Sequence, residues 1–193
     1  MNRFLITGLP RSRTAWMSAL MNTNQSSCIH AVLPEINDIK ELKDAWVSDK
    51  QYVGISDPVL GFFLDYVIEE IKPKILIIER DMNDCELSLE KMGVSRTNYC
   101  DLLLKSMEKH KDHPLVKVIK FNDLSNSEVM KDVFNFLVPD VAFDVARFND
   151  LTKVNIQNHK YMNDITPEKV DNMRHLLKDI MPKIVPKNSV MVN

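Results

Sequence analysis

The chain has 193 residues, a formal charge of −2 at pH 7, 45% apolar residues and 27% charged residues. A chain of this length usually forms one hydrophobic core, so we expect a single domain. The small negative charge excludes a general attraction to nucleic acid or to anionic membranes, and any anion site must therefore be built locally.

Short aliphatic runs alternate with stretches of helical periodicity along most of the chain. Strands are predicted over residues 3–7, 52–56, 74–79 and 116–121. Helices are predicted over residues 14–21, 59–71, 83–92, 97–110, 128–137 and 168–181. Residues 22–50 are interpreted as a loop with a short helix around 36–47. Because the strands are apolar throughout and alternate with helices, they predict a three-layer α/β/α domain with a mainly parallel central sheet.

The sequence GLPRSRTAW at residues 8–16 links the first strand to the first helix. Backbone N–H groups and the helix dipole make such a turn a site for phosphate or sulfate. Arg11 and Arg13 add positive charge, and Ser12 and Thr14 add hydroxyl donors. The turn is no Walker A loop, because Arg13 and Thr14 stand where the second glycine and the lysine would be. A nucleotide kinase-like P-loop protein is therefore the least favoured interpretation.

Arg80 follows the strand predicted at 74–79, and Ser88 comes eight residues later on the next helix. Ligands of open α/β sheets bind at the carboxyl ends of the strands, which is where Arg80 is expected. An arginine fork together with a hydroxyl suits a dianionic phosphate.

Two further features concern the compartment and metal binding. Cys28, Cys85 and Cys100 follow no metal-ligand spacing, so we expect reduced thiols and no metal. The N-terminal residues MNRFLITGLP do not form a signal peptide, and no apolar run is long enough to cross a membrane. We expect a cytoplasmic protein that binds neither membranes nor nucleic acid.

The turn resembles the phosphosulfate-binding loop of the sulfotransferase superfamily, Pro-Lys/Arg-Ser/Thr-Gly-Thr-Ser/Thr. The matching residues are Pro10, Arg11, Ser12, Thr14 and Trp16. Arg13 replaces the family's glycine, and Ala15 replaces a hydroxyl residue. The same superfamily ends a central strand with an arginine and places a serine eight residues later, as at Arg80 and Ser88.

A third match lies at residues 117–124 and 133–137, which resemble a strand ending in Tyr-Glu-Asp-Leu and a helix ending in Phe-Leu. Its role in the superfamily is mainly structural. The resemblance spans roughly residues 3–137. It implies one sulfotransferase-like α/β domain of P-loop-like topology over residues 1–193, in which the part from about 139 carries no match.

The resemblance implies transfer of a sulfuryl group from 3′-phosphoadenosine 5′-phosphosulfate (PAPS) to a hydroxyl or amine of a small-molecule or carbohydrate acceptor. The products include adenosine 3′,5′-bisphosphate (PAP), and no metal is required. Arg11 would stabilise charge on the bridging oxygen, while Arg80 and Ser88 would bind the 3′-phosphate. The remaining cofactor-binding residues would be Pro10, Ser12, Arg13, Thr14, Ala15 and Trp16, with Trp16 near the adenine.

The acceptor also needs a base within hydrogen-bond reach. Three residues are candidates, in the order His30, Glu35 and Asp57. Superfamily members often carry an acidic residue where this chain has Ala31. An alternative is therefore a nucleotide-binding protein of the same fold without catalytic activity.

Overall fold

The computed structural model describes residues 2–32, 41–91 and 99–154. Five parallel strands form one sheet in the order β2-β3-β1-β4-β5. They are β1 (Asn2–Gly8), β2 (Ser26–His30), β3 (Tyr52–Ser56), β4 (Lys74–Glu79) and β5 (Val116–Lys120). The α-helices are α1 (Thr14–Met21), α2 (Leu64–Tyr66), α3 (Met82–Glu90), α4 (Tyr99–His110), α5 (Ser127–Leu137) and α6 (Val145–Thr152). The short helices η2 (Glu41–Trp46), η3 (Val59–Phe63) and η5 (Phe121–Ser125) are 3₁₀-helical, and η4 (Val67–Ile71) is π-helical.

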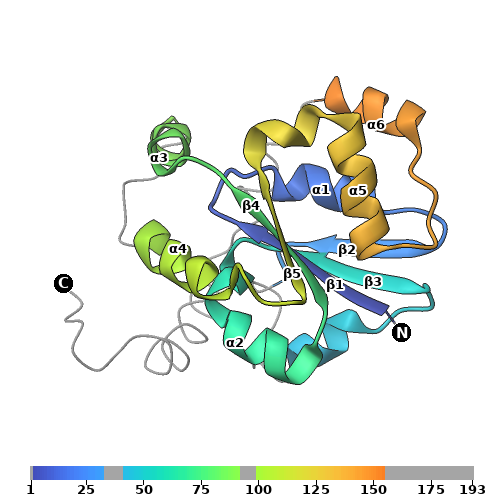
Figure 1. Ribbon diagram of the computed structural model, residues 1–193, viewed down its shortest axis with the longest axis horizontal. Coiled ribbons are helices and arrows are strands. Elements are labelled where there is room, and N and C mark those ends of the chain that lie inside the picture. Colours follow the sequence, from blue (N-terminus) through green and yellow to red (C-terminus); the bar gives the residue numbers. More distant parts are fainter. Residues whose placement is uncertain (1, 33–40, 92–98, 155–193) are drawn as a thin grey trace.

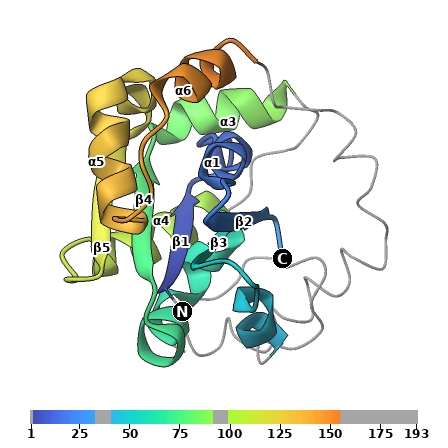
Figure 2. The ribbon, with the colours of Figure 1, turned by 90° about the vertical axis from the view of Figure 1, so that its right-hand side faces the viewer.

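Helices cover both faces of the sheet, as Figures 1 and 2 show. Successive residues of a strand point to opposite faces, so Phe4 and Ile6 pack with α1, α5 and α6. Leu5 points the other way and packs with η2, η3, α2 and α4. The predicted three-layer α/β/α architecture with a parallel sheet is confirmed (Figure 1). The central strands β1 and β4 are largely apolar because both faces of the sheet are covered there, whereas the edge strands β2 and β5 carry more polar residues.

One strand was missing from the sequence prediction. Residues 26–30 form the edge strand β2, although residues 22–50 were predicted to be a loop. Its sequence SSCIH lacks an unbroken aliphatic run, and side chains complete its hydrogen bonding. The Asn22 amide accepts from the Cys28 N–H at 3.0 Å and donates to the Cys28 carbonyl at 2.8 Å, as a neighbouring strand would.

Several predicted helices differ in detail from the observed ones. The stretch predicted at 59–71 is helical over those bounds, but it changes from 3₁₀ to α to π geometry along η3, α2 and η4. Residues 60–64 are consecutive and all buried, whereas a regular amphipathic helix buries only one stripe of its surface. Helix α6 was not predicted, and the helix predicted at 168–181 lies outside the described residues. Within the described ranges, no helix has the length and apolarity needed to span a membrane.

The central strand β1 carries the turn at residues 8–13 to the middle of the sheet. Its neighbours are β3 on one side and β4 on the other. The chain passes from β1 to β2 and β3 and then crosses to β4 and β5. The turn therefore lies where the connections change direction, the usual ligand position of such sheets.

Candidate functional site

The turn after β1 has a backbone suited to an anion. Arg11 and Arg13 both have left-handed conformations, with φ of 72° and 61°. The Ser12 N–H donates to the Leu9 carbonyl at 3.1 Å, and Arg13 is the residue that precedes α1. Left-handed residues alternating with others form concave rows of N–H groups that bind anions. Non-glycine residues in this region cost about 1 kcal/mol or more each, and such strain is concentrated at functional sites.

The structure brings together the two motifs that the sequence placed 69 and 77 residues apart. The Arg11 Nε donates to the Ser88 Oγ at 2.9 Å, which links the turn to α3. The Arg80 guanidinium donates to the Arg11 carbonyl. The pairing of Gly8 with Ile78 explains this contact, because it places Arg80 level with residue 10 of the turn. Arg11, Arg80 and Ser88 therefore form one polar cluster, the basic cluster.

Electrostatics within the basic cluster favour an anionic partner. Burial lowers the pKa of Arg11, and the positive charge of Arg80 lowers it further. The two guanidinium groups thus repel each other in a partly desolvated position, which a bound anion would offset. Burial also raises the pKa of the neighbouring Cys85 thiol to about 11, although the charge of Arg80 opposes this. Cys85 is therefore a neutral thiol and no nucleophile at pH 7.

Arg13 occupies the position of the family's glycine and keeps the conformation that glycine favours. Its guanidinium lies 5.2 Å from the centre of the Trp16 ring and 6.0 Å from that of Phe121. The long side chain thus packs on two aromatic rings beside the turn.

Trp16 is 3% exposed and belongs to the core beneath α6. Its indole N–H donates to the Leu151 carbonyl at 3.0 Å, and its ring meets Phe148 edge-on at 6.0 Å. The contact between Trp16 and adenine stays a prediction. Only the small exposed part of Trp16 is available for such a contact.

The other predicted turn residues differ in how accessible they are. Pro10 and Ala15 are half-buried, while Ser12 and Thr14 are buried. The Ser12 Oγ is buried and interacts with the Cys85 thiol, where it opposes the pKa increase that burial causes.

Two of the three candidate bases lie at neighbouring strand ends. His30 ends β2 opposite Ser56, and Asp57 follows β3. The His30 Nε2 lies 3.4 Å from the Thr14 Oγ1, and burial lowers the pKa of His30. Asp57 is 1% exposed, and its carboxylate accepts from the Val59 N–H at 2.8 Å at the start of η3. Glu35 lies outside the described residues, and Ala31 has a left-handed φ of 55°.

A cavity of about 400 Å³ opens beside the basic cluster at the carboxyl ends of β4 and β5. Its lining includes the apolar residues Leu9, Ile77 and Val118 and the guanidinium-bearing Arg80. Among the described residues, no group of three side chains could hold a metal ion.

Sequence reasoning missed Phe121 as a neighbour of the site. Its ring centre lies 4.2 Å from the Arg80 guanidinium carbon. The signal was present, because Phe121 follows β5 as Arg80 follows β4. Only the pairing of Glu79 with Lys120 shows that the two residues are neighbours.

Comparisons with known proteins identify the fold. No protein-family model matches the chain, and no curated protein matches it. A mouse sulfotransferase, SULT7A1, crystallised in complex with PAP, superimposes with a TM-score of 0.56 at 16% identity. The match covers 94% of this chain and 84% of the mouse chain. A sulfotransferase from Alicyclobacillus acidocaldarius gives a TM-score of 0.51 at 15% identity, over 94% of this chain and 96% of that one.

The chain has the sulfotransferase fold. At such low identities the likeness establishes the architecture alone, and the residues of the site must be judged by their own chemistry. The sulfotransferase fold predicted from the turn at 8–16 and from Arg80 and Ser88 is thus confirmed.

Proposed function

We propose that this protein binds PAPS and transfers its sulfuryl group to a hydroxyl or amine of a small-molecule or carbohydrate acceptor. The observation that carries the proposal is the convergence of Arg11, Arg80 and Ser88 at the end of the central strands. These residues come from the two motifs that resemble the PAPS-binding segments of sulfotransferases. The PAP complex of the mouse structural neighbour is consistent with the same ligand.

The residues present suit a nucleotide with two separate phosphate groups. The left-handed turn offers backbone N–H donors to one anionic group. The Arg80 guanidinium and the Ser88 hydroxyl, which both contact Arg11 of the turn, offer donors to another. Two nearby guanidinium groups complement a ligand of several negative charges better than a monophosphate.

PAPS supplies an activated sulfuryl group on a bisphosphate leaving group. The contribution of the protein is then positioning and charge stabilisation. Arg11 stabilises negative charge next to the turn, and the dipole of α1 acts in the same direction. Burial lowers the pKa of Arg11, but a guanidinium group keeps its positive charge in proteins.

We infer that His30 accepts the proton from the acceptor. Burial lowers its pKa, so its imidazole is neutral at pH 7 and able to act as a base. The Thr14 hydroxyl, 3.4 Å from Nε2, holds the ring next to the start of α1. Asp57 already accepts the Val59 N–H and is the second candidate.

Turnover and nucleotide preference test the proposal together. Incubation with PAPS and a panel of hydroxyl and amine acceptors should release PAP, and an Arg11→Ala variant should not. Calorimetry should show tighter binding of PAP than of ATP. A preference for ATP would refute the proposal.

A second candidate function is nucleotide binding without catalysis. Ala31 favours it, because a methyl side chain stands where related enzymes often have an acidic residue. Tight PAP binding without PAP release from PAPS across the whole acceptor panel would identify this function.

A further inference from the structure

Phe121 lies between the two motifs of the proposed nucleotide site. The Arg80 guanidinium carbon is 4.2 Å from its ring centre, and that of Arg13 is 6.0 Å away. Both distances are within the range of cation–π attraction. The ring is half-buried and packs against the core shared with α1 and α5. It therefore provides a fixed surface for two cations from different parts of the chain.

Strand pairing fixes this arrangement. Glu79 of β4 pairs with Lys120 of β5, so the next residues, Arg80 and Phe121, leave the sheet side by side. Phe121 begins η5, whose Leu124 is fully buried and anchors the segment. The position of the ring thus depends on the sheet and the core.

Arg80 needs such support because it lies close to another cation. Arg80 and Arg11 both carry a positive charge, and their repulsion would drive a flexible side chain towards solvent. The Arg80 guanidinium instead reaches the Arg11 carbonyl. An aromatic face stabilises a guanidinium through its quadrupole and leaves the N–H donors at the edge of the cation available.

We propose that Phe121 is a positioning residue that holds the Arg80 guanidinium, and more weakly that of Arg13, in the orientation that recognises the 3′-phosphate. The inference rests on the proposed function. Phe121 then contributes to the preference for PAP over nucleotides that lack a 3′-phosphate.

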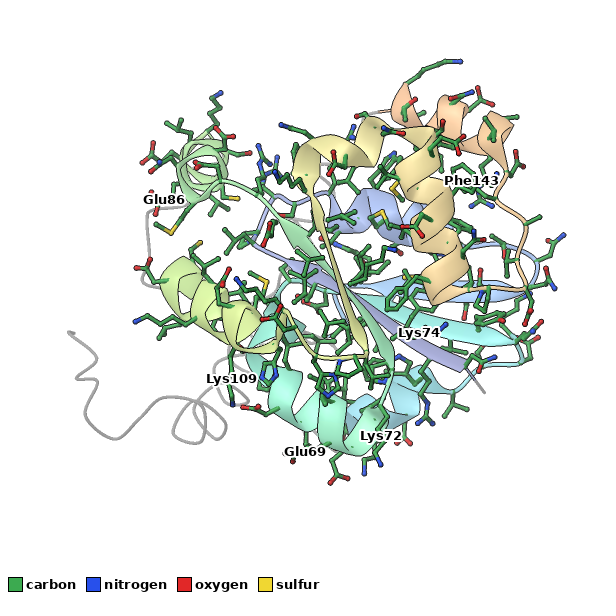
Figure 3. All side chains as sticks on the ribbon, viewed as in Figure 1. Glu69, Lys72, Lys74, Glu86, Lys109 and Phe143 are labelled. Carbon is green, nitrogen blue, oxygen red and sulfur yellow. The ribbon has the colours of Figure 1, made fainter. Side chains whose placement is uncertain are left out.

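Phe136 offers a matched control. It too is a half-buried phenylalanine packed against the same core, and it contacts two cations, Lys74 at 5.5 Å and Lys117 at 5.6 Å. Lys74 begins β4 and Lys117 is the second residue of β5, so both lie at the opposite end of the sheet from Arg80. Figure 3 shows Lys74 far from Glu86 of α3, the helix that carries Ser88 of the basic cluster. Phe136→Leu removes an equivalent ring without touching the site.

The test measures the affinities of the full chain for PAP and for adenosine 5′-monophosphate (AMP) by calorimetry. Phe121→Leu should weaken PAP binding about five- to tenfold and AMP binding less than twofold, as expected for one lost cation–π contact at a partly buried site. Phe121→Tyr, which keeps the aromatic face, should restore the wild-type ratio. In an Arg80→Ala background, Phe121→Leu should have little further effect on the PAP to AMP ratio.

The outcomes separate the inference from the proposed function. Wild-type protein that does not prefer PAP over AMP would overturn both. If the wild type prefers PAP, equal losses for PAP and AMP in Phe121→Leu would show direct contact with the nucleoside and overturn the inference alone. The same selective loss in Phe136→Leu would trace the effect to core stability and also overturn it.

Discussion

Arg80 is the residue whose removal should separate recognition of the 3′-phosphate from recognition of the rest of the nucleotide. Arg80→Ala removes a fork of donors, so we expect PAP affinity to fall by about tenfold to a hundredfold, the loss of one or two charged hydrogen bonds. AMP affinity should change little. Arg80→Lys should recover only part of the loss, because an ammonium group lacks the planar fork. Calorimetric titration with both ligands measures the difference.

Lys117→Ala provides the control for that variant. Lys117 is also a cation, but it pairs with Asp132 at the amino end of β5. If Lys117→Ala reduced PAP binding as much as Arg80→Ala, the effect would be one of overall charge. Equal losses of PAP and AMP in Arg80→Ala would contradict a role for Arg80 at the 3′-phosphate.

His30 should determine the acid side of the pH–rate profile. Burial lowers its pKa below the ordinary histidine value of about 6.5, so the imidazole is neutral above that value and becomes protonated as the pH falls. The kcat/KM for sulfuryl transfer should therefore decrease below a midpoint lower than pH 6.5. His30→Asn should lower the plateau rate by about 10² to 10⁴ and abolish this limb, while PAP affinity is unchanged.

Two variants test the assignment of the base. His113→Asn changes another histidine, in the turn between α4 and β5, and should leave the profile intact. If Asp57→Asn abolished the acid limb while His30→Asn retained the wild-type rate, the base would be Asp57.

At the scale of elements, the entry to the turn depends on a close approach between β1 and β4. A Cβ at Gly8 would lie 2.6 Å from the Ile78 carbonyl oxygen, a backbone atom that cannot move alone. Gly8→Ala should therefore push the turn away from Arg80. We expect a loss of about 1–3 kcal/mol in the free energy of unfolding and a marked loss of PAP affinity. Thermal unfolding and calorimetry measure the two effects.

Gly61→Ala is the matched control for this element. A Cβ at Gly61 would lie 2.4 Å from the Leu103 Cδ1, which is the tip of a flexible side chain. Gly61 belongs to η3 and lies outside the turn. This variant should lower stability without a selective loss of PAP binding. If Gly8→Ala bound PAP as tightly as the wild type, the turn would not be the phosphate-binding element.

The sequence predicts some of the strands and misses one of them. The central strands β1, β3 and β4 are recognisable as mostly apolar runs, because a parallel strand covered on both faces is largely apolar. The edge strand β5, with the sequence VKVIK, is predicted from its β-branched residues instead. The edge strand β2, with the sequence SSCIH, forms no such run, because its residues are only alternately buried and Ile29 is 46% exposed.

The residues of the site also differ in whether the sequence predicts them. Arg80 and Ser88 could be predicted from their resemblance to the arginine and serine of sulfotransferases, because a strand end and an eight-residue spacing are local features of the sequence. The contact of Phe121 with Arg80 depends on which strands are neighbours, and this is a property of the whole sheet. The conformation of Arg13 was also hidden, because an arginine in the left-handed region contradicts its intrinsic preference.

For the whole molecule, the contrast between the net charge of −2 and the basic cluster predicts how ligand binding responds to salt. The protein as a whole does not attract an anion, so attraction must come from the local charges of Arg11 and Arg80. At a concentration 100 times its dissociation constant, PAP should stabilise the fold by about 2.7 kcal/mol. For a chain of this size, that corresponds to an increase in Tm of roughly 5–11 °C. Scanning calorimetry with and without PAP measures it.

Salt should reduce this stabilisation at a fixed PAP concentration. At 1 M ionic strength charges are screened over about 3 Å, so the attraction between the guanidinium groups and the ligand weakens. The Tm increase should shrink as NaCl is raised from 0.05 M to 1 M, and it should shrink less in Arg80→Ala, where one of the two charges is already missing. An increase that does not depend on salt, or one that is equal for AMP at the same concentration, would mean that binding rests on the nucleoside and not on the two phosphates.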